Sequence, residues 1–177
     1  MDLSAKMATY PRHGHLIMSL FPNILNLFKE GLVYPLQEEQ ILVYSGKKYS
    51  GEEALVDAGD LADEDKFVNK IIDSLGYIQP DFLFFKDNRY IQSSNGLKTA
   101  GVPDLVVEVW SDNNDRWERD FKFRIYSSSE KCEHWYMEQD MNQVERFLGK
   151  TKLTSATIKE VMHTTKGIAF DLRHLAL

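Results

Sequence analysis

Apolar residues recur at helical spacing in three parts of the chain, at 15–28, at 67–75 and at 116–126. Residues three and four positions apart lie on one face of a helix, so each part predicts an amphipathic helix. Gly31 and Gly76 follow the first two, as is typical of helix ends. The polar stretch SDNND precedes the third, and one of its Asp or Asn residues is expected to cap that helix.

Short runs rich in branched and aromatic residues predict strands between these helices. They lie at 40–44, 77–85, 105–110, 134–138, 143–148 and 167–172. The second and third runs are separated by a turn-rich segment, which predicts that they pair antiparallel as central strands. The third run is followed directly by the helix at 116–126. The pattern therefore predicts an α/β fold around a central sheet.

Length and composition fit one globular domain. The chain has 177 residues, of which 43% are hydrophobic and 27% charged, enough to bury a core. No run approaches the roughly 18 apolar residues of a membrane span. The N-terminal residues also lack the charged-then-apolar order of a secretory signal. We therefore expect one soluble, cytoplasmic domain over residues 1–177.

Charge and motif content exclude several classes of function. The net charge of −6 argues against broad attraction to nucleic acid, so any contact with DNA must be local or metal-assisted. Phosphate-binding loops, nucleophile elbows, zinc helices and dinucleotide fingerprints are missing from the sequence, which argues against nucleotide hydrolases, esterases and dehydrogenases. Cys132, the single cysteine, is expected to be a small packing residue.

Two acidic residues interrupt apolar strands. Asp81 lies in YIQPDFLFF and Glu108 in LVVEVW. Antiparallel pairing would bring Asp81 beside Glu108, and a shared divalent ion would offset the cost of burying two carboxylates. Asp104 is a rival partner, but four strand residues separate it from Glu108 by roughly 13 Å, too far for one metal. Asp81 could instead be a turn residue after Pro80.

Lys122 is the candidate cation for this site. A helix that packs back across the sheet can project a lysine over the strand end beside Glu108, where hydrolysis of a phosphodiester needs positive charge. The alternative is a solvent-exposed ion pair with Glu118, four residues earlier in the helix. His13 and His15 form another possible metal-binding pair, although N-terminal histidines are more often incidental.

Several motifs occur in an order that resembles the Uma-type restriction endonuclease family. These are PD at 80–81, PDLVVEVWS at 103–111, ERDFKFRIY at 118–126 and EHWYME at 133–138. The resemblance implies a restriction endonuclease-like fold of the PD-(D/E)XK superfamily, with a central mixed sheet flanked by helices in the order αβββαβ. By comparison with the family pattern, residues 45–76 are an insertion, and the usual N-terminal hairpin is missing.

The resemblance also implies a function and a site. Asp81 and Glu108 would bind Mg²⁺, which Mn²⁺ could replace, and the Val109 carbonyl would be a possible third ligand. Lys122 would orient water or stabilise charge. The implied activity is that of a DNA endonuclease, with a homodimer suited to cutting both strands. The alternative is an inactive binding module on the same fold. Tyr126 and Trp135 are expected to pack in the core.

Overall fold

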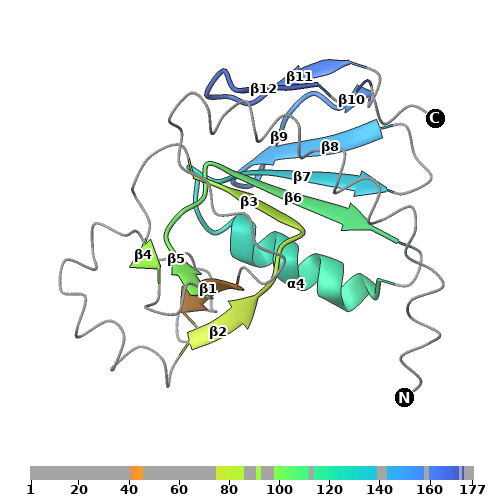
Figure 1. The fold of residues 1–177 in the computed structure, drawn as a ribbon. Coiled ribbons are helices and arrows are strands. Elements are labelled where there is room, and N and C mark those ends of the chain that lie inside the picture. The colour runs from red at the N-terminus through yellow and green to blue at the C-terminus, as the bar shows by residue number, and fades with distance from the viewer. Residues whose placement is uncertain are drawn as a thin grey trace.

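The computed structural model describes residues 41–45, 75–85, 91–92, 98–111, 114–138, 143–157, 160–171 and 173. Within these ranges the chain forms strands in three sheets and one long helix (Figure 1). The predicted helix at 15–28, residues 67–74 of the next predicted helix, most of the predicted insertion at 45–76, and both His13 and His15 lie outside the described residues, whereas Leu75, the predicted end of the second helix, begins strand β2.

The central sheet is mixed and has six strands in the order β10-β8-β7-β6-β3, with β9 paired to β8. Strand β3 runs antiparallel to β6, β6 runs parallel to β7, and β7 runs antiparallel to β8. A parallel pair needs a crossover connection, and α4 supplies it between β6 and β7. This is the α/β arrangement that the sequence pattern predicts. The bounds are β3 Phe82–Phe84, β6 Leu105–Trp110, α4 Arg116–Tyr126, β7 Glu133–Glu138, β8 Gln143–Leu148, β9 Thr151–Lys152 and β10 Ala156–Thr157.

Two smaller sheets complete the described part of the chain. One has four strands in the order β2-β1-β5-β4, and the other is the antiparallel pair β11 and β12. Their bounds are β1 Ile41–Ser45, β2 Leu75–Ile78, β4 Ile91–Gln92, β5 Lys98–Ala100, β11 Val161–His163 and β12 Ala169–Asp171.

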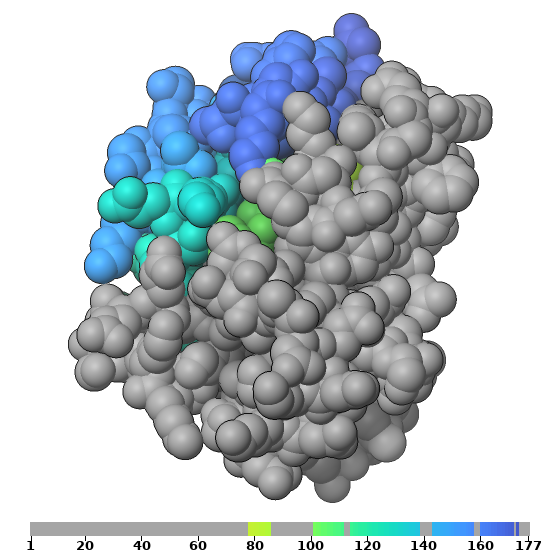
Figure 2. All heavy atoms as spheres, turned by 90° about the vertical axis from the view of Figure 1, so that its left-hand side faces the viewer, coloured from red at the N-terminus to blue at the C-terminus, as the bar shows by residue number. Residues whose placement is uncertain are grey.

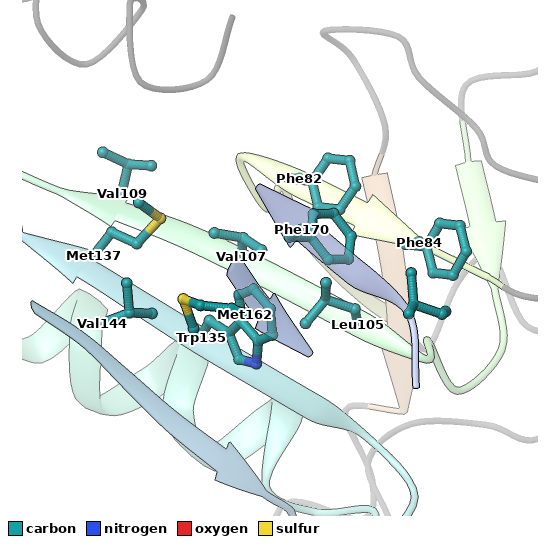
Figure 3. Packing of buried hydrophobic residues seen from close by; sticks show 11 residues of the cluster. Phe82, Phe84, Leu105, Val107, Val109, Trp135, Met137, Val144, Met162 and Phe170 are labelled. Carbon is teal, nitrogen blue, oxygen red and sulfur yellow. The ribbon is translucent and has the colours of Figure 1, made fainter. Parts of the chain in front are cut away.

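The central sheet lies between two different layers, α4 on one face and the β11–β12 pair on the other (Figure 1). Side chains alternate between the two faces of a strand, so β6 contributes to both cores. Leu105, Val107 and Val109 pack with Met162 and Phe170 of the hairpin (Figure 3). The other face packs against α4 through the buried side chains of Val106, Trp110, Ile125, Tyr126, Cys132 and Tyr136.

The part of the surface formed by residues 143–171, drawn in blue, gathers at the top of the face shown in Figure 2. Teal atoms, which the colour bar assigns to the stretch that includes α4 and the residues after it, lie below it. Across the described residues, no helix is both long and apolar enough to cross a membrane.

The prediction of one strand at 77–85 is wrong. The run is divided into β2 and β3, which belong to different sheets. The division falls at Pro80 and Asp81, because proline has no N–H to donate and is confined to the ends or edges of strands. The predicted antiparallel pairing with 105–110 is nevertheless confirmed for β3, in which Leu83 is opposite Val106.

Most other predicted elements are present, with small shifts. The helix at 116–126 and the strand at 143–148 are confirmed with the predicted bounds. The predicted strand at 40–44 forms β1, but it lies in the four-stranded sheet instead of the central one. Asp115 is the N-cap residue of α4, yet its side chain makes no capping hydrogen bond.

Candidate functional site

Glu108 projects from the centre of the sheet toward α4. It alternates with Val107 and Val109, which point into the opposite core, and it shares its own face with Val106 and Trp110. Only 1% of Glu108 is exposed to solvent. A carboxylate at such a depth is costly unless other groups bind it, so its partners decide what it does.

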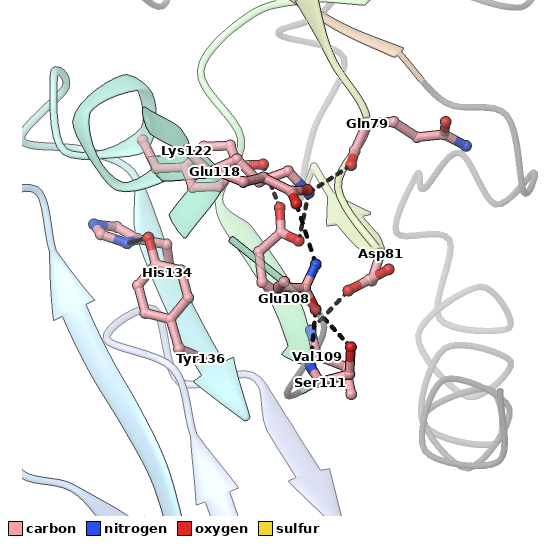
Figure 4. A network of polar contacts seen from close by, with 11 residues as sticks. Gln79, Asp81, Glu108, Val109, Ser111, Glu118, Lys122, His134 and Tyr136 are labelled. Carbon is pink, nitrogen blue, oxygen red and sulfur yellow. Dashed lines mark hydrogen bonds and ion pairs between the residues drawn. The ribbon is translucent and has the colours of Figure 1, made fainter. Parts of the chain in front are cut away.

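Helix α4 supplies a partner to each oxygen of Glu108 (Figure 4). The ammonium of Lys122 donates to Oε2 at 2.8 Å, and the hydroxyl of Tyr126 donates to Oε1 at 2.5 Å. Lys122 and Tyr126 are four residues apart, so they lie one above the other on the same face of the helix. One helix face therefore holds both oxygens of the buried carboxylate.

Asp81 reaches the same end of β6 from the neighbouring strand. Its Oδ2 accepts a 2.7 Å hydrogen bond from the backbone N–H of Val109. In the β3–β6 register Val107 is opposite Phe82, so Val109 lies beyond the end of β3, and the Asp81 side chain satisfies its amide. The N–H and C=O of a strand residue point toward the same neighbouring strand, so the Val109 carbonyl also faces the Asp81 side.

The burial of Glu108 and Lys122 shifts the pKa values of both groups. The pKa of Glu108 is raised from 4.5 to about 8, chiefly because the group is buried; the charge of Lys122 lowers this pKa, and the charge of Asp81 raises it. Burial lowers the pKa of Lys122, but the charge and hydrogen bond of Glu108, with Asp81 and Glu118, raise it above its ordinary value overall. The site therefore keeps Lys122 charged, and it disfavours ionisation of Glu108 beside the charge of Asp81.

Lys122 is held by more than Glu108. Its ammonium also donates to the Gln79 carbonyl at 3.0 Å, lies 3.7 Å from Glu118 and sits 5.4 Å from the centre of the Trp110 ring. The ion pair with Glu118 exists as the sequence suggested, but the Lys122 side chain is only 12% exposed and its closer partner is Glu108. The interpretation of Lys122 as a solvent-exposed helix residue is therefore wrong.

The connection between β6 and α4 is fixed by a second set of contacts. Asn114 accepts from the backbone N–H and the hydroxyl of Ser111, and it donates to Glu118 at 3.2 Å. Arg119 donates to the Ser111 carbonyl at 2.9 Å and forms an ion pair with Glu138 at the end of β7. These contacts hold the start of α4 against the ends of both parallel strands, which sets where Lys122 points.

The donor set at this strand end fits a hard divalent cation. Two carboxylates and a backbone carbonyl are oxygen ligands, which Mg²⁺ prefers, and Mg²⁺ usually keeps several waters besides one or two carboxylates. The raised pKa of Glu108 also fits a cation, because burial disfavours the ionised carboxylate and a bound cation would stabilise it. In the described part of the chain, no group of three or more His, Cys, Asp or Glu side chains could hold a metal ion.

The structure also shows where the other candidate residues lie. Asp104, at the opposite end of β6 from Trp110, forms an ion pair with Lys166 near the β11–β12 turn and does not join Glu108. Cys132 and Trp135 are buried, as expected. Tyr126 is buried too, but the sequence reasoning missed its hydrogen bond to Glu108. The available signal was its position four residues beyond Lys122.

Comparison with known proteins gives a family match. Residues 68–160 match the family model Uma2, described as "Putative restriction endonuclease". A crystal structure described as a "putative nuclease belonging to DUF820 from Anabaena variabilis ATCC 29413" is similar with 14% sequence identity and a TM-score of 0.43. The match covers 57% of this chain and 62% of that one, less than two thirds of its length. No curated protein matches the sequence.

Proposed function

The chain belongs to the Uma2 family, its α/β core is of the restriction endonuclease-like class, and from this premise we propose that it is a Mg²⁺-dependent endonuclease that hydrolyses phosphodiester bonds in DNA. The observation that supports this most directly is the grouping of a strand-end aspartate, a buried glutamate and a lysine at the end of β6. Oxygen ligands beside a fixed ammonium are what hydrolysis of a phosphodiester requires.

Each residue of the site has a defined role in this proposal. The carboxylates of Asp81 and Glu108, with the Val109 carbonyl, would hold the ion. When bound, Mg²⁺ or Mn²⁺ supplies Lewis-acid chemistry and a more acidic water. Lys122 orients the attacking water or stabilises negative charge on the phosphate from its position over Glu108. Tyr126 keeps the Glu108 carboxylate in one orientation.

A non-catalytic binding module is the second candidate, and one observation favours it. Lys122 and Tyr126 already bind both oxygens of Glu108, so the buried carboxylate is satisfied without any ion. In that case the group would serve only to join α4 to the sheet. The net charge of −6 also fits a protein that does not bind DNA broadly.

Plasmid cleavage separates the two candidates. We expect purified protein to nick or linearise supercoiled plasmid with Mg²⁺ or Mn²⁺ and to be inactive with EDTA. Asp81→Asn, Glu108→Gln and Lys122→Met should each reduce the rate by at least about 100-fold, the scale for losing one group that stabilises developing charge. The matched controls are Asp120→Asn and Lys152→Met, whose side chains are 62% and 54% exposed. Equal residual activity in wild type and all variants would contradict the nuclease.

The same proposal extends to the setting in which the protein works. We propose a single domain over residues 1–177 with an insertion at 45–76, acting in the cytoplasm. A homodimer would place two such strand ends on the two strands of a duplex, which suits double-strand cutting. Light scattering on the purified protein measures its oligomeric state, and a strict monomer that linearises plasmid in one step would contradict the dimer.

A further inference from the structure

Helix α4 carries an exposed tryptophan whose ring stacks on a partly buried phenylalanine. Trp117 is 73% exposed, and its ring stacks on that of Phe121 with centroids 5.2 Å apart and an interplanar angle of 17°. The two residues are four positions apart and therefore share one face of the helix. Indole rings are seldom left so open to water, because their burial is strongly favourable.

The pair shares two turns of α4 with residues of the site but lies on a different face of the helix. Trp117 precedes Glu118, and Phe121 precedes Lys122. The carboxylate of Glu118 lies 3.7 Å from the Lys122 ammonium, which in turn binds Glu108. A strand bound at the aromatic pair would therefore lie along the same helix that carries Lys122.

Positive charge accompanies the aromatic rings. Arg116 has a side chain 95% exposed, and exposed Arg124 lies seven positions after Trp117, on the same helix face. Residues 116–126 contain two further basic residues, Arg119 and Lys122, and two acidic residues, Glu118 and Asp120. Lys122 and Arg119 are paired with Glu108 and Glu138, so the positive charge that this helix offers to phosphate is that of exposed Arg124 and of Arg116, which lies 4.0 Å from Asp120.

We propose that the exposed ring of Trp117, supported from below by Phe121, is a stacking platform for an unpaired base of a nucleic-acid strand, with Arg116 and Arg124 binding the adjacent phosphates. Flat aromatic faces beside guanidinium groups are how proteins bind single strands, because every base offers a π-face but no base of an intact duplex is free to stack. The inference rests on the proposed nuclease function and narrows its substrate to nucleic acid with unpaired nucleotides.

The protein contains its own probe for this contact. The chain has three tryptophans, of which Trp110 and Trp135 are only 4% and 0% exposed. Intrinsic fluorescence that a nucleic acid can quench therefore comes from Trp117. In EDTA, which prevents metal-dependent cleavage, a short oligothymidylate should quench this fluorescence, and the same strand paired in a duplex should quench it less. Equal quenching by the duplex would overturn the proposal.

Affinity variants complete the test, measured by anisotropy of a labelled oligothymidylate. Trp117→Ala should weaken binding about tenfold, whereas Trp117→Phe, which keeps a stacking ring, should stay within about threefold of wild type. Val161→Ala is the control, since Val161 is an exposed apolar residue on another element. Replacing Arg116 and Arg124 together by Gln should lower the slope of log affinity against log salt by about 1.4. Unchanged affinity in Trp117→Ala would overturn the platform.

The outcomes also separate this inference from the proposed function. Quenching by the oligonucleotide without plasmid cleavage would leave the platform standing and remove the nuclease. Metal-dependent cleavage with wild-type affinity in Trp117→Ala would do the reverse. A Trp117 signal that changes with protein concentration alone would mean that a second copy of the chain covers the aromatic pair, and this too would overturn the proposal.

Discussion

Glu108 combines two properties that rarely occur together, near-complete burial and an acidic side chain. Its oxygens are bound by an ammonium and a phenol, yet burial still raises its pKa to about 8. In water an ordinary glutamate is ionised far below neutral pH. Folding is therefore linked to proton uptake at Glu108 over a range of pH in which ordinary glutamates stay ionised.

The stability of the cation-free protein should fall as pH rises from about 6.5 to 8. The folded protein keeps the Glu108 proton up to about pH 8, whereas the unfolded chain has lost it above 4.5. The folded state then binds more protons, so raising the pH favours unfolding by up to about 1.4 kcal/mol per pH unit. Urea unfolding in EDTA at several pH values measures this slope.

Glu108→Gln is the matched variant for this measurement, because it keeps the shape of the side chain and cannot ionise. Its stability should depend less on pH over the same range. Buried His134, whose pKa burial lowers to about 4, is neutral in both states above its ordinary value of 6.5 and does not contribute there. Parallel pH profiles for wild type and Glu108→Gln would show that Glu108 is not the linked group.

At the scale of elements, α4 acts as a rigid arm that presents two donors to one carboxylate. The spacing of Lys122 and Tyr126 places both on one helix face, and the contacts of Asn114 and Arg119 fix how the helix leaves β6. Because the start of α4 is fixed against the sheet, Tyr126, one turn after Lys122, can be as important to the site as Lys122 itself.

Tyr126→Phe should destabilise the protein by about 1–3 kcal/mol, since it removes the 2.5 Å hydrogen bond to Glu108 and leaves a buried oxygen without that donor. Urea unfolding at pH 7 measures the loss. Tyr136→Phe is the comparison, because its hydroxyl bonds the neutral ring of His134 at 2.9 Å and should cost less. In the Glu108→Gln background the cost of Tyr126→Phe should shrink, and an unchanged cost would mean that the two groups are not coupled.

The sequence predicts elements well where one signal dominates. Helical spacing without proline gives α4 with its observed bounds, and a short run that contains branched and aromatic residues gives β8. It fails where two signals compete, as in 77–85, where an apolar run hides the break that Pro80 makes. The approach of Asp81 to the end of β6 follows from antiparallel pairing alone. The reach of Tyr126 to Glu108 depends on how α4 packs, which no local pattern encodes.

At the scale of the whole molecule, the sheet is a middle layer whose two faces have different coverings. The site lies on the α4 side, and the β11–β12 pair covers the other (Figure 1). That hairpin is anchored by Glu133, a buried carboxylate at the start of β7. Glu133 accepts from Trp135 and Arg146, and also from the backbone N–H and hydroxyl of Thr165 in the hairpin turn. A second buried acid, Asp104, pairs with Lys166 next to it.

Loss of one turn contact should therefore loosen the hairpin layer without disturbing the site. Thr165→Val removes the 2.7 Å bond from its hydroxyl to Glu133 and keeps the backbone bond of 2.6 Å, so we expect a cost of about 1–2 kcal/mol. Thr157→Val is the control, because its hydroxyl bonds Glu160 on the surface and should cost less than about 0.5 kcal/mol. Hydrogen exchange should become faster in β11 and β12 of Thr165→Val, while α4 keeps its protection, since the two layers touch opposite faces of the sheet. Equal acceleration in α4 would mean that the layers unfold as one unit and that the hairpin is not a separately anchored covering.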